Sequence, residues 1–164
     1  MTDIPGRPLK LSLRLRDYDY SQAGYYYVTI CTEERRCYFG EVIEGNVHLN
    51  DSGKIVQSVW NDLPRRFPGV TLDEYIIMPN HMHGIVVQSE KTVAPKAAPA
   101  LGQIIRAFKA VSTHKIRTSL QPGFAWQIDF YDHIIRRNGE LDRIRAYIVN
   151  NPMRWSLARD NHQE

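Results

Sequence analysis

Two histidines near the middle of the chain, His81 and His83, alternate with Met82 in the segment MPNHMHGIVV. Side chains of a β-strand point alternately to opposite faces of the sheet, so an extended segment places both imidazoles on one face and Met82 on the other. Two neighbouring imidazoles on a stiff strand can supply half of a divalent-metal site. Gly84 follows directly, and its missing side chain leaves room for a ligand or a neighbouring backbone.

A single His-x-His pair is a weak signal, because such pairs are more often polar residues on an exposed sheet face. A two-histidine phosphoesterase needs a second His-x-Thr/Ser element, which this sequence lacks, and a histidine-triad hydrolase needs a third alternating histidine where this chain has Ile85. Zinc hydrolases usually add a further histidine or an acidic ligand. The remaining histidines show no ligand spacing: His48, His114, His133 and His162.

The second chemical feature is a tyrosine near the C-terminus, in the segment LDRIRAYIVNNP. Tyr147 and Asn151 are four residues apart and therefore share one face of a helix, a turn from each other. One helix then presents both a nucleophilic hydroxyl and an amide oxygen, while Ile144 and Ile148 form an apolar stripe that packs on a sheet. Tyr147 is equally compatible with a core-edge tyrosine when the helix is considered alone.

The elements that position these residues follow from hydrophobic periodicity and turn signals. The first strand is expected to begin at Gly24, with further strands at 37–42, 46–49, 70–78 and 82–88 and around 124–130. Helices are expected at about 55–63, 101–118 and 140–151. Asp51 and Ser52 are the expected N-caps of the first helix, and Pro152 is expected to end the last one. This order favours an α+β fold, with a largely antiparallel sheet covered by helices.

The length of 164 residues corresponds to one domain, and an apolar fraction of 43% is enough for a real core. We divide the chain into a basic N-terminal arm (1–20), one domain (21–155) with a mobile linker at about 90–100, and a C-terminal tail (156–164). No stretch approaches the roughly 20 apolar residues of a membrane span, and no signal-peptide region is evident, so we expect a cytosolic protein without a membrane partner. Cys31 and Cys37 are expected to be reduced thiols.

The net charge of +3 is too small to indicate nucleic-acid binding, but its distribution is informative. Arg14 and Arg16 lie in the basic arm. On the helix at 101–118, the residues Arg106, Lys109 and Arg117 lie opposite an apolar face. Such charges are most often solvated surface, and these five residues are the candidates for contact with nucleic-acid phosphates.

Taken together, these segments resemble the single-tyrosine transposases of the HUH nuclease superfamily, in which a His-hydrophobe-His strand meets a tyrosine helix. The similarity is greatest to the REP-associated tyrosine transposases and covers roughly residues 10–155. The segments that carry it are GYYYVTICTEERRCYFG, LDEYIIMPNHMHGIVV, FYDHIIR and AYIVNNPMRW.

The resemblance implies an RNA-recognition-motif-like (ferredoxin-like) sheet and a metal-dependent reaction. His81 and His83 match the metal-binding histidines, and Tyr147 matches the nucleophile. Asn151 occupies the third-ligand position, where simpler relatives often have the longer glutamine. The ion is expected to be Mg²⁺ or Mn²⁺, and the substrate single-stranded DNA beside a hairpin, cut and rejoined through a 5′-phosphotyrosine. Relatives include monomers and dimers, so a homodimer is an open expectation.

Two other functions compete with this interpretation. Replication and conjugation initiators of the same superfamily use the same chemistry, but they usually attach this domain to a larger scaffold. A domesticated DNA- or RNA-binding module that has lost cleavage is the alternative from a different class. The presence of His81, His83 and Tyr147 argues against that loss.

Overall fold

A computed structural model describes residues 15, 17–90 and 98–160. Its centre is a four-stranded antiparallel sheet in the order β4-β5-β1-β6. The strands are β1 (Gly24–Cys31), β4 (Val70–Met78), β5 (His81–Gln88) and β6 (Tyr131–Ile135). A separate hairpin is formed by β2 (Gly40–Ile43) and β3 (Asn46–Leu49). The predicted α+β class with an antiparallel sheet is therefore confirmed.

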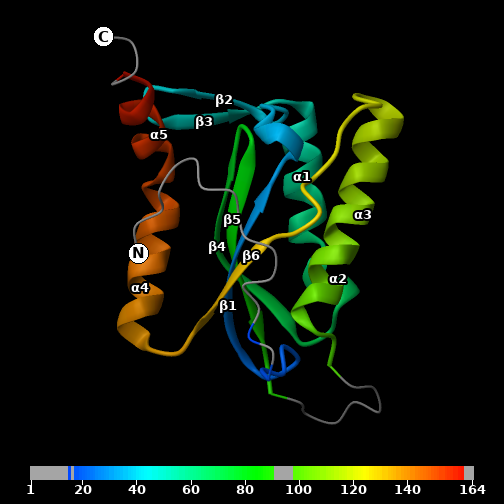
Figure 1. The fold of residues 1–164 in the computed structure, drawn as a ribbon, viewed down its shortest axis with the longest axis vertical. Helices are drawn as coiled ribbons and strands as arrows, with labels where there is room; N and C mark the ends of the chain where they lie inside the picture. Colours follow the sequence, from blue (N-terminus) through cyan, green and yellow to red (C-terminus); the bar gives the residue numbers. More distant parts are fainter. Residues whose placement is uncertain (1–14, 16, 91–97, 161–164) are drawn as a thin grey trace.

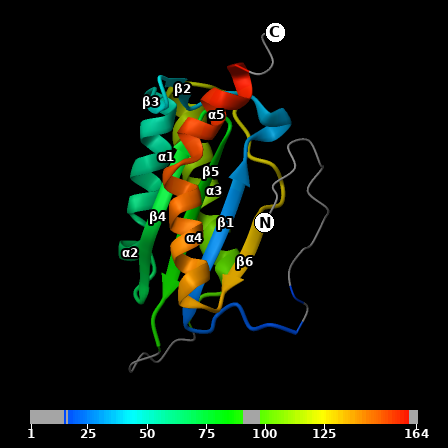
Figure 2. The ribbon, with the colours of Figure 1, turned by 90° about the vertical axis from the view of Figure 1, so that its left-hand side faces the viewer.

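Helices cover both faces of the sheet, which lies between α4 and the pair formed by α1 and α3 (Figure 1). The helices are η1 (Glu33–Arg35), α1 (Asp51–Asn61), α2 (Leu63–Arg66), α3 (Leu101–Ser119), α4 (Asn138–Val149) and α5 (Asn151–Asp160). Seen from the side, α4 runs along the sheet with the strands behind it, and α5 continues toward the β2–β3 hairpin (Figure 2). No helix within the described ranges is long and apolar enough to cross a membrane.

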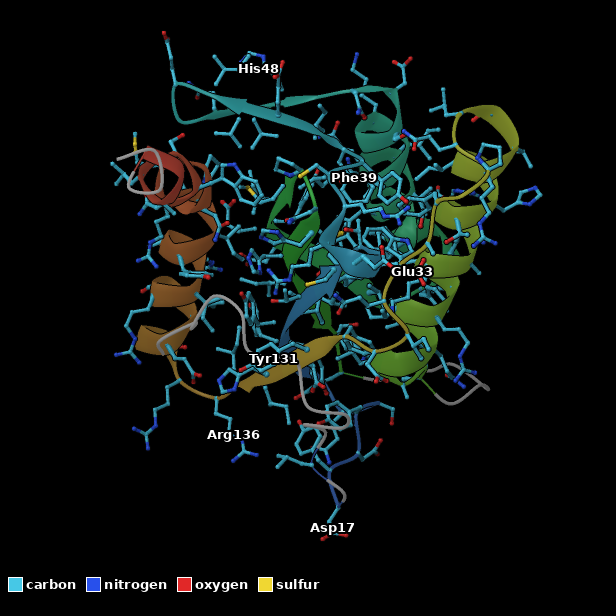
Figure 3. All side chains as sticks on the ribbon, turned by 45° about the horizontal axis from the view of Figure 1, so that its top comes forward. Asp17, Glu33, Phe39, His48, Tyr131 and Arg136 are labelled. Carbon is cyan, nitrogen blue, oxygen red and sulfur yellow. The ribbon has the colours of Figure 1, made fainter. Side chains whose placement is uncertain are left out.

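The alternation of side chains along β1 and β5 divides the core into two layers. The larger layer, between the sheet and α1 and α3, buries Tyr26, Met82 and Trp60. The smaller layer, beneath α4, contains Tyr27, Ile85, Ile135, Ile144 and Ile148. Side chains fill the space on both sides of the sheet, with Phe39 in the layer near α1 and Tyr131 on β6 (Figure 3). The predicted apolar stripe of Ile144 and Ile148 is confirmed.

Gly84 serves a different purpose from the predicted one. A Cβ at this position would lie 2.5 Å from Cζ2 of Trp60, a fully buried side chain of α1. The missing side chain therefore accommodates the Trp60 indole on the α1 side of the sheet. Since His83 points to the other side, Gly84 leaves no opening for a ligand there.

Several predicted boundaries were wrong. Asn50, rather than Asp51 or Ser52, caps α1, and its side chain accepts a hydrogen bond from the Gly53 amide. Pro152 does not follow the last helix as predicted. It lies in the first turn of a further helix, α5, where a missing N–H is tolerated. Residues 156–160, assigned above to a tail, accordingly belong to α5.

The last strand also lies later than predicted, at Tyr131–Ile135 instead of 124–130. The earlier segment makes only an isolated bridge between Thr32 and Trp126. Its three consecutive carbonyls from residues 127 to 129 accept hydrogen bonds from the Lys109 ammonium. A segment bent around one cation cannot offer those carbonyls to a neighbouring strand.

Candidate active site

His81 and His83 lie side by side on the α4 side of the sheet, with their ring centroids 4.8 Å apart. Met82 between them is buried in the opposite layer, as the strand periodicity predicted. Only 9% of His81 and 2% of His83 is exposed. The competing interpretation, two polar residues on an exposed sheet face, is therefore wrong. Buried imidazoles need partners or ligands, because burying a polar group without them is costly.

The His83 ring is held at its Nδ1 atom by two hydroxyl groups of β1. Tyr27 Oη and Thr29 Oγ1 each lie 2.8 Å from that nitrogen. Burial lowers the pKa of His83 well below its ordinary value, and the nearby His81 and Arg35 lower the pKa further. The ring is consequently neutral at physiological pH, which is the form that can bind a metal ion.

His81 is held by its neighbour in the turn between β4 and β5. Its Nδ1 atom lies 2.6 Å from Oδ1 of Asn80. On the other side, the His81 ring lies 6.0 Å from the Trp155 ring of α5. In both histidines Nδ1 faces a protein group, so a metal ion would be bound through Nε2.

Tyr147 reaches these histidines from α4. Its ring centroid lies 5.5 Å from that of His83, with an angle of 70° between the ring planes. Ile144 and Ile148 of the same helix are buried against the sheet and fix the helix in place. Two residues before Tyr147, Arg145 adds a bidentate ion pair with Asp73 of β4, at 2.6 and 2.8 Å. The structure thus brings together the two sequence segments that were predicted to meet.

Asn151 lies on the same side, although not on the same helix. Helix α4 ends at Val149, Asn150 breaks the helical run, and Asn151 is the first residue of α5. Its side chain is buried, with 7% exposed. Trp155, one turn later on α5, contacts His81, so the face of α5 that carries Asn151 is directed at the histidines.

Within the described residues, no three side chains of the types His, Cys, Asp and Glu are close enough to hold a metal ion together. A metal centre here must therefore complete its two imidazoles with another kind of donor. The Asn151 amide oxygen is a donor of that kind. Two imidazole nitrogens and an amide oxygen suit a divalent ion of intermediate hardness, such as Mn²⁺.

Two arginines that the sequence analysis did not select also belong to the site. The guanidinium carbon of Arg154 lies 4.9 Å from the centre of the Tyr147 ring. Arg35 of η1 is close enough to His83 to affect its pKa. Tyr147 lies on α4 and Arg154 on α5, so no helical spacing in the sequence linked them. Arg35 stands beside Arg36 in the sequence, and no pattern around it indicated a site.

The predicted DNA-binding residues of α3 do not form a uniform outward-facing set. Lys109 donates to the carbonyls of Gln127, Ile128 and Asp129 at 2.8, 3.1 and 3.1 Å, so its predicted outward orientation is wrong. Arg117 donates from Nε to the Phe124 carbonyl at 2.7 Å. Together with the exposed Arg106, they line an open groove of about 550 Å³ between α3 and residues 125–128. Arg14 and Arg16 lie outside the described residues.

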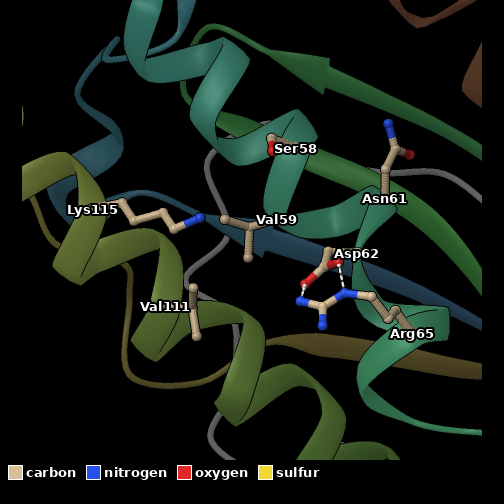
Figure 4. Close-up of a pocket in the computed structure, with 7 residues that line it drawn as sticks. All are labelled: Ser58, Val59, Asn61, Asp62, Arg65, Val111 and Lys115. Carbon is tan, nitrogen blue, oxygen red and sulfur yellow. Dashed lines mark hydrogen bonds and ion pairs between the residues drawn. The ribbon is translucent and has the colours of Figure 1, made fainter.

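A second cavity, of about 470 Å³, lies between α1 and α3 (Figure 4). An ion pair between Asp62 and Arg65 crosses its edge. Both helices cover the sheet face opposite α4, so this cavity is separate from the histidines and the tyrosine. Its exposed ion pair is of the kind that contributes little to binding or stability.

Comparison with known proteins places this geometry in a family. Residues 20–151 match the family model described as "Transposase IS200 like". This range contains His81, His83, Tyr147 and Asn151. The chain belongs to the IS200-like transposase family.

Individual relatives and solved structures are also similar to this chain. An uncharacterised protein of Haemophilus influenzae is 37% identical over 159 residues, covering 88% of each chain. The fold is similar to that of a REP-associated tyrosine transposase solved with a REP hairpin, with a TM-score of 0.62, 20% identity, and coverage of 86% of this chain and 73% of the other. A candidate transposase from Deinococcus radiodurans R1 has a TM-score of 0.51 and 17% identity, over 84% and 95% of the chains.

Proposed function

We propose that this transposase cleaves and rejoins single-stranded DNA beside a hairpin, with Tyr147 as the nucleophile. The observation that carries the proposal is the contact of the Tyr147 ring with His83 on a buried sheet face. A tyrosine that served only the core would not need a pair of buried histidines on one side and the Arg154 guanidinium over its ring. The burial of both histidines also excludes a simple role on the protein surface.

The donor set fits a divalent metal ion. His81 and His83 would bind it through Nε2, and the Asn151 amide oxygen would be the third protein ligand. Imidazole donors favour Mn²⁺ over Mg²⁺ at equal concentration, whereas Mg²⁺ prefers oxygen donors. When bound, the ion supplies Lewis-acid polarisation of the scissile phosphate and stabilises charge on the departing oxygen.

Tyr147 performs the bond exchange. Its phenolic oxygen forms a bond to phosphorus while the bond from phosphorus to the 3′ oxygen breaks, and the phenolic proton is balanced by the one gained by the released 3′ hydroxyl. The phosphodiester energy is retained in the phosphotyrosine, so another 3′ hydroxyl can reverse the step and join strands. The reaction requires no water nucleophile and no nucleotide cofactor.

Arg154 is placed to hold the phosphate during this exchange. Its guanidinium lies over the ring that carries the attacking oxygen, and a guanidinium binds phosphate oxygens through paired hydrogen bonds. Arg35 supplies a second positive charge from the β1 side of the site. The two positive charges reduce the repulsion between the anionic DNA backbone and a tyrosine that is losing its proton.

A hairpin substrate is supported by the similar fold that was solved with a REP hairpin. In this chain, Arg106 and Arg117 line one open groove where phosphates could bind, and the basic N-terminal arm is expected to add contacts. Phosphate contacts carry no sequence information, so selection must come from the folded hairpin and its unpaired bases. Binding should weaken steeply with salt.

The deciding experiment is detection of a covalent protein–DNA adduct on a denaturing gel, with Mn²⁺ and a single-stranded hairpin oligonucleotide. Tyr147→Phe should abolish the adduct, and His81→Ala, His83→Ala or excess chelator should abolish metal-dependent cleavage. Tyr131→Phe is the matched control, because Tyr131 lies on the same sheet face, with its ring 6.1 Å from that of Tyr27.

Three outcomes would contradict the proposal. An adduct formed by Tyr147→Phe but not by Tyr131→Phe would move the nucleophile to Tyr131. Full cleavage in excess chelator would remove the metal role. Hairpin binding without any adduct would favour the domesticated binding module, and equal cleavage of a perfect duplex would overturn the proposed substrate.

A further inference from the structure

We propose that Asn80 is a positioning residue that fixes the tautomer of His81, so that Nδ1 carries the proton and the Nε2 lone pair is presented to the metal site. The tautomer concerns the metal-free protein, while its purpose rests on the proposed function. Asn80 lies in the β4–β5 turn, immediately before His81, and only 9% of it is exposed.

The hydrogen bonds of Asn80 determine which of its side-chain atoms faces His81. One end lies 3.2 Å from the main-chain carbonyl oxygen of Arg35. A carbonyl can only accept a hydrogen bond, so that end must be the Nδ2 amide group. The other end, 2.6 Å from His81 Nδ1, is therefore Oδ1.

The same reasoning then applies to the imidazole. Oδ1 of an amide has no hydrogen to donate, so His81 Nδ1 must be the donor in this bond. A neutral imidazole carries one proton, and placing it on Nδ1 leaves Nε2 unprotonated. A metal ion binds the lone pair of an unprotonated nitrogen, whereas the opposite tautomer would present a proton to the ion.

The main chain around Asn80 is held just as firmly. Its carbonyl accepts a hydrogen bond from the Thr32 amide at 3.0 Å, and the Thr32 hydroxyl lies 2.9 Å away. Thr32 itself is completely buried. These bonds connect the β4–β5 turn to the end of β1, and the bond to the Arg35 carbonyl holds the Asn80 side chain beside His81.

An unusual backbone places the Arg35 carbonyl at this point. Glu34 and Arg35 have φ angles of 54° and 51°. Two consecutive non-glycine residues in the left-handed region are uncommon and persist only where the surrounding structure holds them. The strained turn thereby provides the acceptor that orients Asn80, and it places the Arg35 charge near His83.

The first test measures the tautomer directly in the protein without metal. Long-range ¹H–¹⁵N spectra of protein labelled in histidine distinguish a protonated from an unprotonated ring nitrogen. They should be recorded about two pH units above the ordinary imidazole pKa. The His81 signals are identified by their loss in His81→Gln. We expect a protonated Nδ1 and an unprotonated Nε2, and the opposite pattern would overturn the proposal.

Two variants extend the test. Asn80→Leu removes the acceptor and should release His81 to a mixture of tautomers or to the Nε2–H form. It should also weaken Mn²⁺ binding, measured by calorimetry, about 10- to 100-fold. Asn80→Asp retains an oxygen beside Nδ1 and loses only the donor to Arg35, so the Nδ1–H tautomer and most of the Mn²⁺ affinity should remain.

The outcomes separate this proposal from the function. An unchanged tautomer and unchanged Mn²⁺ affinity in Asn80→Leu would refute the role of Asn80, even if Tyr147 formed adducts normally. Conversely, a missing adduct in the wild-type protein would not alter the expected spectrum. If Asn80→Leu fails to fold, the wild-type spectrum and Asn80→Asp still decide the question.

Discussion

Gly84→Ala tests whether the strand that carries the histidines is fixed by its contact with α1. The new methyl group would lie 2.5 Å from Cζ2 of Trp60 and 3.1 Å from Cη2. The indole cannot move away easily, because it is fully buried and its ring centroid lies 5.2 Å from that of Phe108. Overpacking of this kind costs about 1–3 kcal/mol of unfolding free energy.

Part of that cost is offset, because alanine is favoured over glycine in a strand by about 0.5–1 kcal/mol. The contact is far inside the optimal carbon–carbon distance of about 3.5–4 Å, which favours the upper part of the range. We therefore expect a net loss of about 2 kcal/mol, measured by urea denaturation with an unchanged slope.

A double-mutant cycle identifies the cause. Trp60→Phe removes the indole atoms that the methyl group would strike, so in that background Gly84→Ala should cost roughly nothing or stabilise by up to about 1 kcal/mol. Equal costs of Gly84→Ala in both backgrounds would refute the reasoning, because the loss would then not come from Trp60.

Three further predictions concern charged residues. Lys109→Met should lower the unfolding free energy by about 1–3 kcal/mol without changing the salt dependence of DNA binding. Arg106→Gln should leave the stability unchanged but reduce the slope of the logarithm of the DNA-binding constant against the logarithm of the salt concentration by about one. Arg154→Gln should slow single-turnover adduct formation by about 10²-fold, with hairpin affinity within a few-fold of wild type, and Arg154→Lys should be intermediate; equal rates would remove Arg154 from the site. The hydrogen bond from Arg145 lowers the pKa of Asp73, so this carboxylate stabilises the fold above its unfolded pKa and loses that contribution as pH falls through its folded pKa. The stability difference between wild type and Asp73→Asn should therefore be largest near neutral pH and shrink below about pH 4; a difference that grew in acid would contradict the pairing.

Periodicity in the sequence was enough to predict most of the site. The strand period of two placed His81 and His83 on one face and Met82 on the other, and the helical period grouped Ile144 with Ile148 below Tyr147. These patterns reflect backbone geometry, which is the same wherever a strand or helix occurs. The meeting of the two segments followed from the resemblance to a known family, since no local pattern encodes a contact between β5 and α4.

What the sequence could not determine was how individual side chains are used. Lys109 looked like any outward-facing helical cation, yet its charge holds three carbonyls of a segment that is distant in sequence. The space beside Gly84 is filled by the Trp60 indole. The position of the proton on His81 depends on Asn80, which is oriented by the Arg35 carbonyl of a strained turn. Such roles depend on which residues the packed sheet and helices bring within hydrogen-bond distance. That is set by tertiary packing, because a side chain's partner lies wherever the folded chain puts it.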